Sequence, residues 1–301
     1  MTVALRCPVR SCGETLERHP RLWRCPRGHT FDLARSGYCN LLQPQERRSA
    51  RPGDSSEAVA ARRRLAEAGF AAHLHETLRA EIGTLGLGAD AAVLDLGCGE
   101  GSFLGGLVRD TGWEGHGLDL SAEALDLAAR RHPEATWIVA NADRSLPYAA
   151  SSFDLVTSLD ARLHPEEIRR VLRPSGTLLV AVPAADDLAE LRRTVLGPEE
   201  GEGKDRLTRA EGLLAERFEV VRRLQSRTTQ VLSPERARDA LIATYRAGRA
   251  SREPALEALG TLEVTLAHEV GVFRPRLDGS ATPTGQAPEA KLAPYRPPGL
   301  A

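Results

Sequence analysis

The chain has 301 residues, of which 42% are apolar and 4% aromatic, and its formal net charge is −1. This length and apolar content suit one α/β domain with a small accessory module. No stretch approaches 18 apolar residues, and the N-terminus lacks an apolar signal-peptide run. We therefore expect a cytoplasmic protein without a membrane span.

The charge is distributed unevenly along the chain. Residues 1–64 contain 13 arginines, no lysine and 6 acidic residues, a balance of +7, so the remainder sums to −8. Arginine suits bidentate recognition of phosphate and stacking on bases. A biased genome composition also enriches arginine, but it would affect both parts of the chain alike. The asymmetry favours a basic N-terminal region that meets a polyanion.

Residues 1–45 are predicted to form a zinc-binding module. Three cysteines and one histidine follow a Cys-x4-Cys-x12-Cys-x3-His spacing, namely Cys7, Cys12, Cys25 and His29. This donor set suits tetrahedral Zn²⁺, and so short a segment gains from a metal because it cannot build a core alone. His19 is an alternative fourth ligand. The alternative without a metal is a set of free cysteines, since an odd total of five argues against a disulfide framework.

Residues 46–88 are predicted to be a polar linker followed by a helical pattern from about Glu57 to Ile82. The following region, 89–274, alternates strand-like and helix-like runs, which predicts a parallel, Rossmann-like α/β sheet. Strands are expected at 92–96, 116–120, 136–140, 153–159 and 177–182, and two further strands at 218–224 and 262–272. Residues 275–301 hold six prolines and little apolar content, which is typical of a disordered tail.

The ends of the first three expected strands carry a candidate nucleotide crevice. The run D-x-G-C-G-E-G begins at Asp95 and joins a buried strand to a helix start, and Asp119 ends the next strand. The run lacks the G-x-G-x-x-G pattern of dinucleotide sites. A carboxylate before the turn suits the amino group or sulfonium of S-adenosylmethionine, and Asp119 suits ribose hydroxyls. The predicted cofactor residues are Asp95, Gly97, Cys98, Gly99, Gly101, Asp119, Leu120, Asn141 and Ala142.

A plain structural turn is the alternative for these glycines, but two acids at successive strand ends favour the cofactor. Residues 93–183 resemble class I S-adenosylmethionine-dependent methyltransferases. The N-terminal run C-P-R-G-H-T-F-D, from Cys25 to Asp32, and G-Y-C-N-L-L, from Gly37 to Leu42, resemble the zinc finger of RlmA-type 23S rRNA (guanine-N1)-methyltransferases. Pro52–Ser55, Ala61–Arg63 and Ala68-Gly69 follow in the family's order.

This resemblance implies a class I methyltransferase sheet with an N-terminal zinc-binding module. It also implies methylation of N1 of one guanine in a 23S rRNA hairpin, an activity that in some members gives macrolide resistance. Three features depart from the family: the first cysteine spacing is two residues longer, Ala71 with Phe70 beside it replaces an aromatic, and the 158–164 loop lacks an apolar stretch with proline. A small-molecule, natural-product methyltransferase that retains the zinc module is therefore an alternative.

A third class, a nucleic-acid-binding protein without catalysis, is disfavoured by the intact cofactor motif. Guanine N1 carries a proton, so its methylation needs a base or a stabilised anion. We hypothesise that Asp160, after the fourth strand, is that base, with His164 as a rival and a loop-capping role as the alternative. Phosphates of the RNA are expected to meet Arg24, Arg27, Arg35, Arg47, Arg48 and Arg51. Two protomers, as a homodimer, could hold one RNA.

Overall fold

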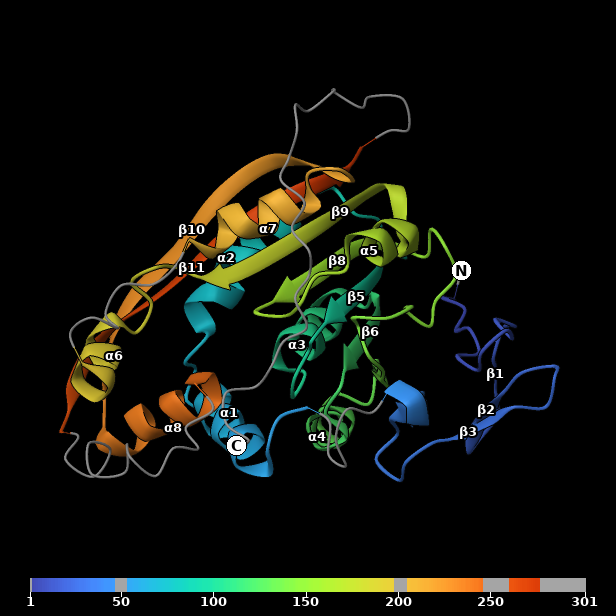
Figure 1. Cartoon of the computed structure of the whole chain (residues 1–301), viewed down its shortest axis with the longest axis horizontal. Coiled ribbons are helices and arrows are strands. Elements are labelled where there is room, and N and C mark those ends of the chain that lie inside the picture. Colours follow the sequence, from blue (N-terminus) through green and yellow to red (C-terminus); the bar gives the residue numbers. More distant parts are fainter. Residues whose placement is uncertain (1, 47–52, 198–204, 246–259, 277–301) are drawn as a thin grey trace, which may run out of the picture.

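The computed structural model describes residues 2–46, 53–197, 205–245 and 260–276. These residues form a sheet of eight strands in the order β10-β11-β9-β8-β5-β6-β7-β4, flanked by helices, and a separate sheet of three short strands (Figure 1). The strands of the large sheet are β4 (Cys39–Asn40), β5 (Ala92–Leu96), β6 (Glu114–Asp119), β7 (Thr136–Val139), β8 (Phe153–Leu159), β9 (Leu172–Pro183), β10 (Phe218–Leu232) and β11 (Leu262–Pro275).

The predicted parallel α/β sheet is confirmed. Strands β4 to β9 pair in parallel, and β10 and β11 form a long antiparallel ribbon on β9. Two strands, β5 and β8, have the bounds expected from sequence. Strand β9 begins at Leu172, earlier than predicted, because Leu172 pairs with Phe153 and the stretch Pro174–Gly176 is extended.

Helices cover both faces of the sheet and bury separate apolar clusters. One face packs against α2 (Ala72–Gly83), α3 (Ser102–Thr111) and α4 (Ala122–Arg131). The other packs against α5 (Pro165–Val171) and α7 (Arg206–Leu214). Helix α4 begins directly after Ser121, because the Ser121 hydroxyl accepts the amide of Ala124 and caps the helix.

The helix predicted over 57–82 is wrong as one element, because it is broken into α1 (Ser56–Glu67) and α2. Gly69 adopts φ +71° between them, a left-handed conformation that ends a helix. Helix α1 then packs against α8 (Pro234–Tyr245) and α6 (Ala189–Leu196) in a third apolar cluster. These three helices gather beyond the carboxyl ends of β8 and β9 (Figure 1).

The N-terminal segment is bound closely to the large sheet. Its own sheet consists of β1 (Glu17–Arg18), β2 (Leu22–Arg24) and β3 (Thr30–Asp32), and a 3-10 turn, η1 (Pro44–Glu46), follows β4. Strand β4 extends the large sheet beside β7, and Leu5 bridges to Tyr148. No helix lies between β7 and β8 in the described chain, and buried Leu5, Cys7 and Leu16 cover that part of the sheet instead.

Three further expectations concern segments beyond the main elements. Among the described residues, no helix has the length and apolar character needed to span a membrane. The predicted tail lies outside the described residues from position 277 onward, as do Arg47, Arg48 and Arg51. These three arginines therefore remain predictions from sequence.

Candidate active site and zinc centre

The structure brings the four predicted metal ligands together. The ligand atoms of Cys7, Cys12, Cys25 and His29 all lie within 4.8 Å of one another. The Sγ atoms of Cys12 and Cys25 are 3.9 Å apart, and His29 Nδ1 lies 3.5 Å from Cys7 Sγ and 3.4 Å from Cys25 Sγ. Ligands of a tetrahedral zinc, with Zn–S bonds near 2.3 Å, stand about 3.8 Å apart. The donor set and its spacing fit Zn²⁺.

Backbone hydrogen bonds close two tight turns that position these ligands. The amide of Cys7 bonds the carbonyl of Glu14 at 2.8 Å, and the amide of Cys25 bonds the carbonyl of His29 at 3.0 Å. Burial acts to raise the pKa of Cys25, yet backbone groups of His29 and Arg27 lower it to about 7, which favours the thiolate that binds metal. His19, the alternative ligand, is exposed and lies outside the cluster.

The glycine turn lies between β5 and α3, as predicted. Gly97 has φ +69°, and a side chain on it would collide with Ala161 of the loop after β8. Gly101 has φ +79°, and its missing side chain makes room for Trp137, so this glycine serves packing as well as the turn. Nothing lies within 4 Å of the Cβ position at Gly99, which leaves that side open to a ligand.

Asp95 is a buried carboxylate near the end of β5, directly before this turn. Its side chain accepts the Thr157 hydroxyl at 2.6 Å, and the residue is 2% exposed. Burial, with the Asp119 charge nearby, raises the pKa of Asp95 from 3.8 to about 7, although the Thr157 bond opposes this. A buried acid in this state gains from a cation, and the amino group and sulfonium of S-adenosylmethionine supply one. The residue present thus fits the predicted cofactor.

The neighbouring strand ends carry the other predicted cofactor residues. Asp119 accepts the amide of Gly99 at 3.0 Å and the amide of Ser121 at 2.8 Å. Burial raises the pKa of Asp119, while these two amides lower it. Asn141, after β7, accepts the amide of Asp143 at 3.0 Å. The remaining predicted positions, Cys98, Leu120 and Ala142, are partly buried beside the same strand ends.

Helix α1 and the segment before it approach the crevice, a feature that the sequence analysis missed. Ser56 donates to Glu123 at 2.6 Å, and a side chain on Gly53 would meet Ser121 at 2.8 Å. The ion pair of Arg62 with Asp54 lies near enough to Asp119 to influence its pKa. The sequence motifs Pro52–Ser55 and Ala61–Arg63 were recognised from the resemblance to the family, but they did not indicate that this segment approaches the crevice.

The loop after β8 adjoins the glycine turn through the Ala161–Gly97 contact. Asp160 has a left-handed backbone with φ +56°, and half of its side chain is exposed. His164, the rival base, instead caps α5 by accepting the amide of Glu167 through Nδ1 at 3.4 Å. Arg162 bonds Asp143 at 3.0 Å and so links this loop to the one after β7.

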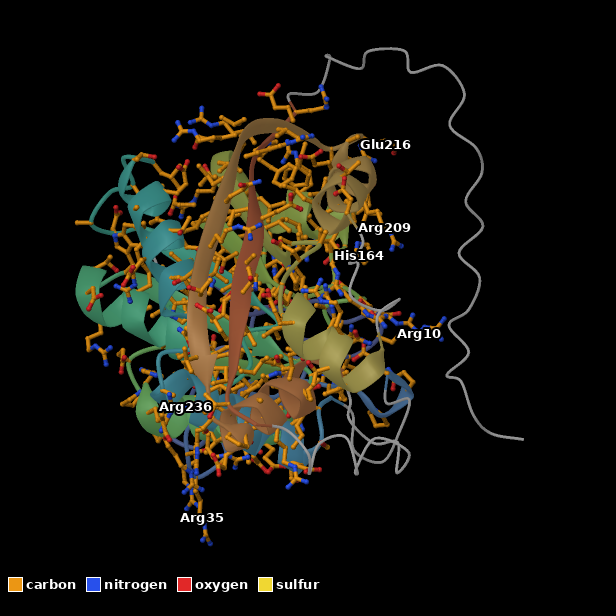
Figure 2. All side chains as sticks on the ribbon, turned by 90° about the vertical axis from the view of Figure 1, so that its left-hand side faces the viewer. Arg10, Arg35, His164, Arg209, Glu216 and Arg236 are labelled. Carbon is orange, nitrogen blue, oxygen red and sulfur yellow. The ribbon has the colours of Figure 1, made fainter. Side chains whose placement is uncertain are left out.

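A groove of about 760 Å³ connects the zinc cluster with the sheet. Its lining includes the zinc ligands Cys7 and Cys12 from the module and Asn141 and Tyr148 from the loops and strand ends of the larger domain. Arg6 and Arg10 also line it, and Figure 2 shows Arg10 and Arg35 projecting from the rim of the molecule. The module's described arginines are all exposed, namely Arg6, Arg10, Arg18, Arg21, Arg24, Arg27 and Arg35.

The three arginines of α1 behave differently and correct part of the charge argument. Arg62 pairs with Asp54, Arg63 lies 3.8 Å from Glu67, and Arg64 pairs with Asp239 at 2.5 Å. The Arg62 and Arg64 pairs join α1 to its surroundings, and the Arg63 pair lies within the helix, so part of the N-terminal +7 balance is structural. The exposed arginines of residues 2–46 remain as the candidate phosphate surface.

Comparisons with known proteins agree with this geometry. The RlmA N-terminal family, a zinc ribbon, matches residues 5–50, and a methyltransferase domain family matches residues 93–176. The 23S rRNA (guanine(748)-N(1))-methyltransferase of Streptomyces fradiae is 41% identical over 189 residues, which cover 62% of this chain and 66% of that enzyme.

Two further relatives are proposed 23S rRNA (guanine-N1)-methyltransferases. The protein from Micromonospora griseorubida is 38% identical over 62% of this chain and 68% of its own length. The protein from Bacillus subtilis is 34% identical over 62% of this chain and 67% of its own length. With a Cys3His zinc ribbon joined to an S-adenosylmethionine-binding sheet, the chain belongs to the RlmA-type 23S rRNA (guanine-N1)-methyltransferase family.

Proposed function

We propose that this protein transfers a methyl group from S-adenosylmethionine to N1 of a guanine in a hairpin of 23S rRNA. The relatives' activity supports this substrate. The observation that carries the proposal is the shared groove, because the zinc ligands Cys7 and Cys12 line it together with Asn141, a residue predicted to bind the cofactor. A nucleic acid lying on the module would therefore reach the crevice without a large rearrangement.

In this proposal the chain acts mainly by positioning two reactants. Bound S-adenosylmethionine supplies the activated methyl group. Asp95 would hold its cationic end, Asp119 would accept hydrogen bonds from its ribose, and Asn141 with Ala142 would bind its adenine. The backbone turn of Gly97, Cys98, Gly99 and Gly101 and the side chain of Leu120 would line its site. Cys7, Cys12, Cys25 and His29 would hold a zinc ion, which would fix the module that bears the arginines.

Asp160 is placed to act on the acceptor. Its half-exposed carboxylate follows β8, and the adjacent Ala161 touches the glycine turn. A carboxylate there would accept the N1 proton of guanine, which makes N1 nucleophilic. Asp160→Asn is expected to lower the methylation rate by roughly 100-fold with unchanged cofactor affinity. Single-turnover kinetics and calorimetry check this, and an unchanged rate would leave proximity alone as the mechanism.

The RNA would be held through its backbone and offered one base. A guanine inside a hairpin must leave its stack to reach the methyl group. Exposed arginines that contact phosphates and stack on splayed bases suit this mode of binding. Arg24, Arg27 and Arg35, predicted from sequence for phosphate contact, are all exposed; Arg27 also donates to the Ser11 carbonyl at 2.8 Å.

The proposal is tested by following labelled methyl groups. Purified protein is incubated with labelled S-adenosylmethionine and either 23S rRNA that lacks the modification or a cell metabolite extract. The expected result is label in 23S rRNA alone, with none transferred by Asp95→Asn. Label in metabolites but not in RNA would support the natural-product alternative and contradict the proposal. Expression in a macrolide-sensitive strain then tests whether the methylation raises resistance.

A further inference from the structure

A second polar cluster lies at the carboxyl edge of the sheet, and it comes from distant parts of the sequence. His268 of β11 places Nε2 3.5 Å from Oδ2 of Asp160, across the end of β9, which separates β8 from β11 (Figure 1). The ring of His73, on α2, lies with its centroid 5.8 Å from that of His268. Asp187 accepts the amide of Ala267, the residue before His268, at 2.9 Å.

The two facing residues differ in exposure. Half of the Asp160 side chain is exposed, whereas only 14% of the His268 side chain is. Nδ1 of His268 is buried without a hydrogen-bond partner among the described residues. Asp160 is thus accessible to a substrate from solvent, whereas His268 is largely buried next to it. A left-handed backbone at a non-glycine residue, as at Asp160, is a strained arrangement of the kind that gathers at functional sites.

We propose that His268 is a positioning residue for Asp160, whose carboxylate it turns toward the acceptor base. This inference rests on the proposed function. In the neutral imidazole, Nε2–H donates to Asp160 Oδ2, and the unpartnered Nδ1 carries the lone pair. The other carboxylate oxygen is then presented to guanine N1. The 3.5 Å separation is long, as such contacts commonly are before substrate tightens them.

The step balances as a proton transfer coupled to a displacement. The N1–H bond of guanine breaks, and its proton passes to the free oxygen of Asp160. The electron pair left on N1 forms the new bond to the methyl carbon as the carbon–sulfur bond breaks, and that bond's electron pair stays on sulfur. The exposed carboxylic acid of Asp160 then returns its proton to water. His268 is not consumed, because it donates the same hydrogen bond before and after the step.

The charge state of His268 controls this arrangement. Burial lowers the pKa of His268, but the hydrogen bond and charge of Asp160 and the charge of Asp187 outweigh it and raise the pKa above its usual value. The charge of Arg206, on α7, lowers the pKa of His268. The other groups that face His268 are His73 and His75 of α2 and the uncharged Ser226 of β10. Protonated His268 would pair with Asp160 and make it a poorer base, so turnover should fall as pH drops through this raised pKa.

The test compares His268→Ala, His268→Gln, Asp160→Asn and the double variant Asp160→Asn with His268→Ala, using single-turnover methylation of rRNA. His268→Ala is expected to lower the single-turnover rate constant at saturating cofactor by roughly 30-fold with cofactor affinity unchanged, and the same substitution should cause little further loss in the Asp160→Asn background. His268→Gln retains an Nε2–H donor, so it should restore this rate constant to within a few fold. At saturating S-adenosylmethionine, which removes the pH dependence of cofactor binding, its rate should lose the acidic limb of the pH profile.

A matched control is His132→Gln, which alters another mostly buried histidine 3.6 Å from a carboxylate, that of Glu134. It should keep the wild-type pH profile. Equal losses from His268→Ala with and without Asp160, or a His268→Gln enzyme that keeps the acidic limb, would overturn the inference. If His268→Ala fails to fold, the pH profile of His268→Gln decides alone. Absence of rRNA methylation by the wild-type protein would instead contradict the proposed function.

Discussion

The N-terminal module carries its described arginines on the surface, whereas the cofactor crevice at the carboxyl edge of the sheet contains the buried carboxylate of Asp95. Exposed cations attract a polyanion through water, and such attraction weakens steeply with salt. The buried carboxylate of Asp95 would contact a bound cation directly. Salt screens such a contact little, but protonation of the carboxyl group removes the attraction. RNA binding by the module should therefore depend mainly on ionic strength, and cofactor binding in the crevice mainly on pH.

The largest expected effect comes from removing the metal. Binding of a structural zinc contributes on the order of 10 kcal/mol in small zinc domains, so its loss should unfold the module. The damage should spread, because Leu5 and Cys7 belong to the apolar cluster of the large sheet and β4 pairs with β7. His29→Ala should therefore lower the thermal midpoint and abolish rRNA binding.

The control for this change lies in the same module. His19→Ala alters an exposed histidine outside the ligand cluster and should keep both the zinc content and the thermal midpoint. Zinc content by atomic absorption and melting by circular dichroism measure both variants. A His29→Ala protein with wild-type zinc and stability would remove the metal from the account.

The second effect concerns Asp95 and the cofactor. Because folding raises the pKa of Asp95 to about 7, affinity for S-adenosylmethionine should weaken as pH falls below 7 and reach a plateau above it. Asp95→Asn should weaken binding by roughly 30- to 100-fold near pH 8 and remove the pH dependence. Isothermal titration from pH 5.5 to 8.5 measures both. A wild-type affinity that does not change over this range would contradict the assigned role.

The same pKa fixes the sign of a stability effect. A carboxyl group whose pKa is higher in the folded state opposes folding once it ionises, so cofactor-free protein should lose stability between pH 4 and 7. Asp95→Asn should therefore match or exceed the wild-type melting temperature at pH 8 while binding less cofactor. A variant that melts lower at pH 8 would show that Asp95 has a structural role instead.

The smallest effects are expected from single arginines of the module. Arg10→Ala, Arg24→Ala and Arg35→Ala should each weaken rRNA binding a few fold at low salt and reduce the slope of log affinity against log salt by about 1. Arg236→Ala, an exposed arginine on α8, should leave the slope unchanged (Figure 2). Filter binding between 50 and 300 mM salt resolves these differences, and equal slopes for all four variants would remove the module as the phosphate surface.

The zinc cluster and the acceptor cluster show which parts of the site a sequence can reveal. The four zinc ligands lie within 23 consecutive positions, so their spacing alone predicts that they meet. His73, Asp160 and His268 meet only because β11 pairs with β9 in one register and α2 packs on the same sheet. No local pattern marks His268, since a polar residue in a strand usually faces solvent.

The same distinction applies to the fold: elements defined by local sequence were predicted, and elements that depend on distant pairing were not. Strands β5 and β8 are short apolar runs, and their bounds follow from local sequence. The two-residue strand β4 exists because β7 offers an open edge, which residues 39–40 alone do not indicate. The break at Gly69 was missed because one glycine within a helical pattern is commonly tolerated.

The account depends on delivery of one guanine from the module to the cofactor crevice. The most direct measurement is primer extension on 23S rRNA treated with the protein, because a methyl group on N1 blocks base pairing. We predict one strong stop next to a single hairpin guanine, absent with Asp95→Asn and lost when that guanine is replaced by adenine. Methyl transfer that produces no stop, or stops scattered over many guanines, would contradict the account.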